Sequence, residues 1–129
     1  MKDPSFKCTK PKQFPVSGWS YATGGLVGQV PFVCNGWNSQ GCYALQQSGS
    51  WQKDRYATGE RYAAIGSVTM HNKLVIAGGH KGGDLSTIKV ASPNTRTRTL
   101  PVRLPVGLHS ACIVRWDANT VMVIGGYSV

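Results

Sequence analysis

The sequence predicts an all-β protein built from repeated, four-stranded antiparallel sheets. The composition is the first observation behind this prediction, since 16 Gly and 7 Pro among 129 residues favour short strands and tight turns over long helices. Three hairpin-like segments also recur in phase along the chain. Finally, the second strand of these hairpins is apolar at successive positions, and the apolar fraction of 41% suffices for a packed core.

Each of the three recurring segments pairs two strands around a bend that holds Gly, Asn or Asp, residues that tolerate a positive φ. The pairs and their bends are 21–27 with 30–36 around Gly28, 62–68 with 73–79 around Asn72, and 109–114 with 120–126 around Asp117. Gly36 and Gly79 are 43 residues apart, and Gly79 and Gly126 are 47 apart. A chance likeness in composition would not keep this phase.

Two further strands are expected after each of the first two hairpins, which gives four strands in a unit of about 45 residues, the size of one β-propeller blade. They are 41–45 and 50–53 in the first unit, and 86–91 and 96–99 in the second. The apolar runs of the second strands, such as Leu74–Ala77 and Val121–Ile124, predict that these strands are covered on both faces. The Thr-Arg alternation of residues 95–98 suits an outer edge strand, where charge opposes edge-to-edge aggregation.

Several of these features resemble the kelch family of β-propellers. The glycine pairs Gly78–Gly79 and Gly125–Gly126 each end an apolar strand, Trp51 stands late in the first unit, and residues 61–64 (RYAA) open the next. The resemblance covers residues 20–129 and implies that Trp51 packs between blades and that these glycines, with Gly36, have structural roles. The sequence departs from the family where Asn35 replaces the first glycine of a pair, and where Ala91 and Arg98 replace Tyr and Trp.

The predicted fold is therefore a partial kelch-type β-propeller with four-stranded antiparallel blades. We expect a leader or partial strand over 1–19, blades over 20–57 and 58–104, and the opening hairpin of a further blade over 105–129. A single repeat cannot bury both of its faces. Hence we expect either that further propeller blades continue in a longer protein or that the chain self-associates.

The four cysteines bear on the cellular compartment. Cys34 ends one predicted strand and Cys42 begins the neighbouring one, which brings them within disulfide reach, with two free buried thiols as the alternative. A disulfide would indicate an extracellular or secreted protein, and free thiols a cytoplasmic one. Cys8 and Cys112 could form a second pair, although the apolar strand around Cys112 favours a buried free thiol.

The charge and the motifs of the sequence limit the classes of function that we expect. The net charge of +9 favours acidic partners, but the basic residues are scattered and form no stripe, so nucleic acid is an improbable partner. No apolar run is long enough for a membrane helix. The five acidic residues lie in the leader, loops and turns, and no Cys-x-x-Cys pair occurs. We therefore expect no catalytic residues, no metal and no cofactor.

The loops that follow the three hairpins are the predicted binding surface, because the repeat places them on one rim of a rigid scaffold. The candidate partner-binding residues are Trp37, Asn38, Ser39, His80, Lys81 and Tyr127. The sequence thus predicts a protein-binding scaffold rather than an enzyme. Two alternative functions remain: the chain is part of a propeller enzyme that uses His80 or His109, or it is a purely structural extracellular repeat. If the chain is not an enzyme, we expect the histidines to have surface or capping roles.

Overall fold

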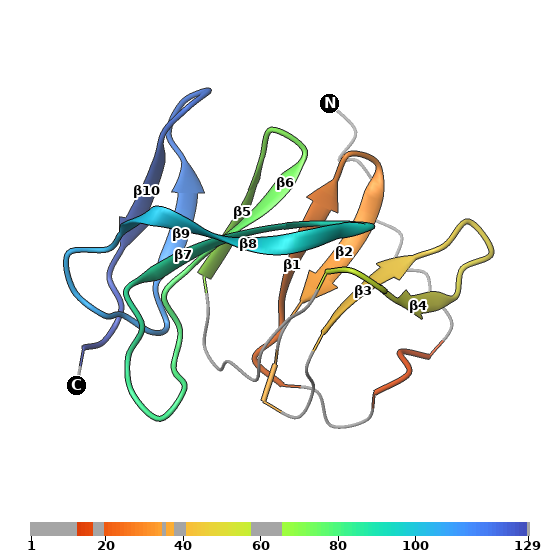
Figure 1. The fold of residues 1–129 in the computed structure, drawn as a ribbon, viewed down its shortest axis with the longest axis horizontal. Coiled ribbons are helices and arrows are strands. Elements are labelled where there is room, and N and C mark those ends of the chain that lie inside the picture. The colour runs from red at the N-terminus through yellow and green to blue at the C-terminus, as the bar shows by residue number, and fades with distance from the viewer. Residues whose placement is uncertain (1–12, 17–19, 35, 38–40, 58–65, 129) are drawn as a thin grey trace, which may run out of the picture.

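A computed structural model of the chain describes residues 13–16, 20–34, 36–37, 41–57 and 66–128. These residues form an all-β fold of three antiparallel sheets (Figure 1), as expected for the fold class. The first sheet has the order β1 (Thr23–Val27), β2 (Val30–Cys34), β3 (Cys42–Leu45) and β4 (Trp51–Lys53). The second has the order β5 (Gly66–Met70), β6 (Lys73–Ala77), β7 (Thr87–Ser92) and β8 (Thr95–Arg103). The third pairs β9 (Cys112–Arg115) with β10 (Val121–Ile124).

All three predicted hairpins are present, and the bends of the first two have the positive φ values expected there, whereas residues 117–119 of the third bend do not. Gly28 has a φ of 62° between β1 and β2, and His71 and Asn72 have φ values of 51° and 54° between β5 and β6. Positive φ at both central residues gives a turn whose twist matches that of the flanking strands. No helix of the described residues is long and apolar enough to cross a membrane.

Some predicted strand boundaries were wrong. The third hairpin begins at Cys112 rather than at His109, because Ser110 has a left-handed φ of 55° that interrupts an extended strand. Strand β8 extends to Arg103, beyond the expected 96–99, and it is the outer strand of its sheet as its Thr-Arg pattern predicted. The expected opening of the second hairpin at 62–65 lies outside the described residues.

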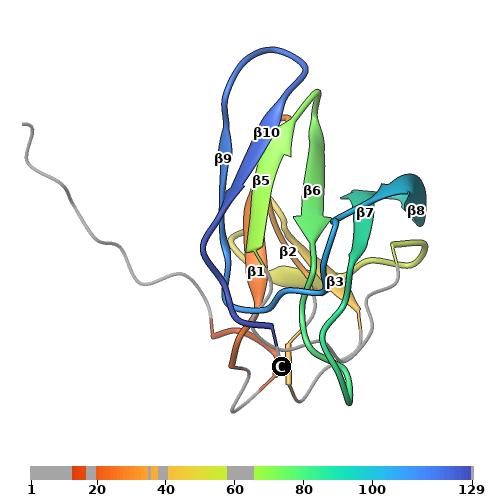
Figure 2. The ribbon, with the colours of Figure 1, turned by 90° about the vertical axis from the view of Figure 1, so that its left-hand side faces the viewer.

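The three sheets lie side by side through their first strands (Figures 1 and 2). Strand β1 packs against β5, and β5 packs against β9. Glycine allows this close approach, since a Cβ on Gly25 would lie 2.5 Å from Thr69 Oγ1, and one on Gly66 would lie 2.7 Å from the Ala111 carbonyl oxygen. Each of these contacts joins two different sheets, so the repeat unit of the sequence corresponds to a separate layer of the structure.

The core lies mainly between the first two sheets, where Phe32 and Leu74 are fully buried. All four residues of Leu74–Ala77 are buried, which confirms that β6 is covered on both faces. The same expectation was wrong for β10, where Met122 and Ile124 are exposed. No sheet of the described part of the chain covers that side of the third sheet, whereas the third sheet itself covers one side of the second.

Asp54 joins the outer parts of the first two sheets. One carboxylate oxygen, Oδ1, accepts hydrogen bonds from the backbone N–H groups of Tyr56 (2.9 Å) and Ala57 (2.7 Å) just after β4. The other oxygen, Oδ2, accepts the backbone N–H of Asn94 in the β7–β8 turn at 2.7 Å. A single carboxylate therefore fixes the chain after β4 and holds the neighbouring sheet beside it.

Candidate functional site

The segments that follow β2, β6 and β10 lie along one side of the three sheets, the lower side in Figure 1, and the hairpin bends lie along the opposite side. We call the side formed by residues 36–37, 78–86 and 125–128 the loop edge. It carries four of the predicted partner-binding residues, namely Trp37, His80, Lys81 and Tyr127. Asn38 and Ser39 lie outside the described residues.

Two of these predicted residues are large exposed aromatics. Trp37 is 57% exposed, and its backbone N–H donates to the carbonyl oxygen of Ser20 at 3.0 Å, which fixes the backbone while the side chain stays accessible. Tyr127 is also exposed and exchanges two backbone hydrogen bonds with His109, of 3.0 and 2.8 Å. Exposed aromatics on a fixed backbone are typical anchors of protein interfaces.

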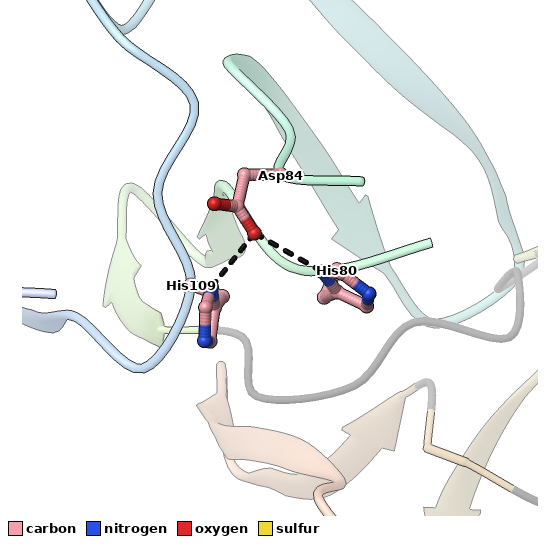
Figure 3. Close-up of polar contacts among 3 residues, drawn as sticks. All are labelled: His80, Asp84 and His109. Atoms are coloured by element: carbon pink, nitrogen blue, oxygen red, sulfur yellow. Dashed lines mark hydrogen bonds and ion pairs between the residues drawn. The ribbon is translucent and has the colours of Figure 1, made fainter. Parts of the chain in front are cut away.

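His80, Asp84 and His109 form a polar cluster at the loop edge (Figure 3). Both Nδ1 atoms point to the same Asp84 oxygen, Oδ1, at 3.0 Å from His80 and 2.7 Å from His109. The His80 and His109 ring centroids are 5.5 Å apart, and the Tyr127 ring stacks on His109 at 5.7 Å. The cluster therefore joins the loop after β6, the segment before β9 and the chain after β10.

Glycines let the backbone hold this cluster. The glycine pair after β6 turns the chain with φ values of 72° at Gly78 and 112° at Gly79. A Cβ on Gly78 would collide with the carbonyl oxygen of Leu108, and one on Gly107 would lie 2.6 Å from the carbonyl oxygen of Asp84. Close approach at both points is open only to residues without a side chain.

Backbone hydrogen bonds then fix the two segments relative to each other. The Gly79 N–H donates to Leu108 O at 2.8 Å, and the Leu108 N–H donates to Leu85 O at 3.1 Å. The Leu85 N–H closes the loop on Gly79 O at 2.9 Å. His80 and Asp84 face each other across an antiparallel bridge within this loop. The three side chains are therefore held by backbone rather than by their mutual attraction alone.

Burial divides the cluster into an inner acid and two outer bases. The side chain of Asp84 is 5% exposed, whereas those of His80 and His109 are 36% and 22% exposed. An ionised carboxylate can only accept hydrogen bonds, so this pattern requires a proton on Nδ1 of each ring and, in the neutral rings, leaves Nε2 as a lone-pair acceptor. The cluster can thus exchange protons or ligate a metal ion.

The sequence placed His80 correctly on a loop after a glycine pair but did not associate it with His109 or Asp84. Asp84 is one of the five acidic residues that the sequence places in the leader, loops and turns, and His109 is 25 residues away from it. The repeat indicated part of the cluster, because His80 and Tyr127 each follow a glycine pair directly and are therefore expected on the same side of the sheets. The bend that brings His109 to the same place depends on Gly107 and Ser110, and no periodicity reports it.

The predicted Cys34–Cys42 disulfide is present. The two residues pair directly across β2 and β3, with a Cα–Cα distance of 4.1 Å, and both are buried. The expectation of a buried thiol at Cys112 was wrong, because Cys112 is an exposed free cysteine on the uncovered side of the third sheet. Cys8, its proposed alternative partner, lies outside the described residues.

The structural residues are placed as follows. Trp51 is half-buried and makes an edge contact with Phe14 of the described leader segment, with ring centroids 5.2 Å apart. The glycine pairs at 78–79 and 125–126 follow β6 and β10 directly, and all four residues have positive φ. Gly36, after β2, has a φ of 146°. The turns at these positions therefore use conformations that favour glycine.

Comparison with models of known protein families gives no match, and a search of curated proteins gives no significant relative.

Proposed function

We propose that this chain is a segment of a kelch-type β-propeller that acts as a protein-binding scaffold rather than as an enzyme. The observation that carries the proposal is that two four-stranded sheets with the same strand order and a two-stranded third sheet pack through their first strands and direct equivalent loops to one edge. Blades of a propeller are related in this way. The phased glycine pairs and the position of Trp51 add the resemblance to the kelch family.

The two end sheets support the view that further sheets belong beside this chain. On the third sheet, paired residues Met122 and Val114 are exposed, as are Ile124 and Cys112, and together they form an apolar surface that we call the open face. Leu26 is exposed on the first sheet. A repeat unit gains its stability from neighbours on both sides. Either further blades of a longer protein or another copy of the chain would cover the open face.

The proposed partner is a protein that contacts the loop edge. Trp37 and Tyr127 supply exposed aromatic surface there, and the net charge of +9 favours an acidic partner by speeding the encounter. The buried Cys34–Cys42 disulfide fits an oxidising compartment, so we propose that the protein is extracellular or secreted. Nucleic acid is not part of this proposal, because the basic residues form no continuous stripe in the sequence.

A capture experiment with two matched variants tests the proposed binding surface. The loop-edge variant combines Trp37→Ala, His80→Ala, Lys81→Ala and Tyr127→Ala, and the control combines Gln29→Ala, His71→Ala, Trp116→Ala and Asn119→Ala near the hairpin bends on the opposite side. Proteins captured from extracellular extract by the unmodified chain and by the control variant should be lost with the loop-edge variant. The proposal would be contradicted if the loop-edge variant still captured these proteins, or if the control variant lost them equally.

A further inference from the structure

We propose that His80, Asp84 and His109 form a binding site for a divalent transition-metal ion, with Zn²⁺ as the ion that their chemistry fits best. This inference is independent of the proposed scaffold function. It rests on one potential ligand atom from each residue, two imidazole nitrogens and one carboxylate oxygen, which all lie within 4.8 Å of one another. Imidazole and carboxylate together are a common ligand set for Zn²⁺ and neighbouring transition metals.

The distances fit a shared ion. Nitrogen and carboxylate ligands bind Zn²⁺ at about 2.0–2.2 Å, so two ligand atoms of the same ion lie roughly 3–3.5 Å apart. The observed Nδ1–Oδ1 distances of 3.0 Å and 2.7 Å lie at or just below the lower end of that range. An entering ion would need to spread each Nδ1–Oδ1 pair by only a few tenths of an ångström. The two imidazole nitrogens lie within 4.8 Å of each other, so the partly exposed rings would also adjust to bring them to the spacing of a shared ion.

Protons must rearrange when the ion binds. In the hydrogen-bonded arrangement each Nδ1 carries the proton that Asp84 Oδ1 accepts. Metal binding needs the lone pair of Nδ1, so each neutral ring moves its proton to Nε2, and no net proton is released from a neutral ring. The carboxylate already presents Oδ1 toward both nitrogens (Figure 3).

The surroundings favour a site that holds the ion and leaves coordination positions open. The backbone of residues 79, 85 and 108 is cross-linked by hydrogen bonds, so the ligands are positioned before the ion arrives. Asp84 is buried, while the two histidines are partly open to solvent, and water can complete the coordination. A bound ion would cross-link the β6–β7 loop to the segment that leads into the third sheet.

Titration of the chelator-treated chain with Zn²⁺ tests the proposal, with the disulfide intact and the thiols of Cys8 and Cys112 alkylated. Calorimetry should show one equivalent bound, and the melting temperature should rise with added Zn²⁺ because the ion binds only the folded site. Co²⁺ should give the visible absorption of a low-coordinate nitrogen and oxygen site. The control His71→Ala removes an exposed histidine of the β5–β6 turn and should change none of these results.

Three variants distinguish a metal site from a hydrogen-bonded cluster. Asp84→Asn retains an amide oxygen that can accept the two imidazole N–H groups but is a poor ligand for Zn²⁺, and it should weaken binding by roughly a hundredfold, at least as much as the loss of an outer-shell partner costs. His80→Ala and His109→Ala should weaken binding as strongly, and circular dichroism verifies that each variant is folded. His80 lies on a partly exposed loop, so its variant keeps the test decisive if Asp84→Asn unfolds.

The proposal would be overturned if the alkylated chain bound no Zn²⁺ while remaining folded. It would also be overturned if Asp84→Asn or His80→Ala bound Zn²⁺ as tightly as the unmodified chain, or if His71→Ala weakened binding equally.

Discussion

Strands β6 and β10 occupy equivalent positions in the repeat but have different surroundings. Both consist largely of aliphatic residues, and both end directly before a glycine pair. Leu74 of β6 is fully buried, whereas Ile124 of β10 is 50% exposed. Among the described residues, the second sheet has a neighbouring sheet on each face, and the third has one on a single face. An apolar strand therefore shows that a face is suited to burial, while the number of neighbouring sheets decides whether it is buried.

The largest difference is expected between alanine substitutions in these two strands. Leu74→Ala should lower the free energy of unfolding by about 2–5 kcal/mol, because it removes a buried side chain and leaves a cavity between the first two sheets. In the monomer, at protein concentrations too low for self-association, Ile124→Ala should change it by no more than about 0.5 kcal/mol, because its side chain is half in solvent. Urea unfolding of both variants, at a protein concentration at which the chain is monomeric, measures the contrast, and equal losses there would contradict it.

The next effect comes from the disulfide of the first sheet. Joint replacement of Cys34 and Cys42 by serine should lower the free energy of unfolding by about 2–3 kcal/mol on the chain-entropy model, because the unfolded chain regains the freedom of a closed loop. Cys112→Ser is the matched control, since this exposed thiol has no disulfide to lose. The same unfolding experiment, run with and without reductant, provides the measurement. Stability that is insensitive to both the double substitution and the reductant would contradict the role of the disulfide.

A smaller loss of stability is expected when the close contact between the second and third sheets is disturbed. Gly66→Ala places a Cβ against Ala111 O and Ile113 Cγ1, each 2.7 Å away, and should cost about 1–3 kcal/mol because the sheets must separate to admit it. Gly83→Ala meets nothing within 4 Å and should stay within about 0.5 kcal/mol of the unmodified chain. Thermal unfolding distinguishes them. A neutral Gly66→Ala would mean that the third sheet packs less closely on the second than described.

The smallest expected effect is a loss of stability at acidic pH that arises in the β9–β10 turn. Two hydrogen bonds to the carboxylate lower the pKa of Asp117 below its ordinary value. The larger effect comes from the backbone N–H of Asn119, and the next from the side chain of Thr120. The contribution of Asp117 to stability is therefore present above its unfolded pKa and is lost as the pH falls through the lowered folded pKa.

Titration of the Asp117 carboxyl carbon by NMR should give a midpoint below that of an unstructured aspartate. Asp117→Asn should remove the corresponding part of the acid dependence of stability and leave neutral pH behaviour nearly unchanged. A normal midpoint would show that this turn is not ordered in solution.

The repeat phase of the sequence predicted much of the fold. Turn residues such as Gly28 and Asn72 favour the backbone conformations of their turns. The segments between the turns have an alternating or a continuous apolar pattern, which predicts strands. The pairing of Cys34 with Cys42 followed from the same argument, because neighbouring antiparallel strands have a fixed register. These features are local, so a single sequence contains the information.

The errors have a common cause in contacts between distant segments. Burial of β10 was predicted from its own residues, although burial depends on a neighbouring sheet. Cys112 was expected to be buried for the same reason. The His80–Asp84–His109 cluster was not predicted, because it requires the approach of Gly107 to Asp84, and a tertiary contact of this kind leaves no periodic signal.

Sedimentation velocity is the most direct test of the claim that the open face of the third sheet is a surface for packing another sheet. In a sample that contains this chain alone, the unmodified chain should form an assembly larger than a monomer as its concentration rises, and the joint change Met122→Lys and Ile124→Lys should keep it a folded monomer, because charge cannot be buried between sheets without a large cost. A chain that remains monomeric at every concentration, with the same sedimentation coefficient before and after the substitutions, would contradict the account.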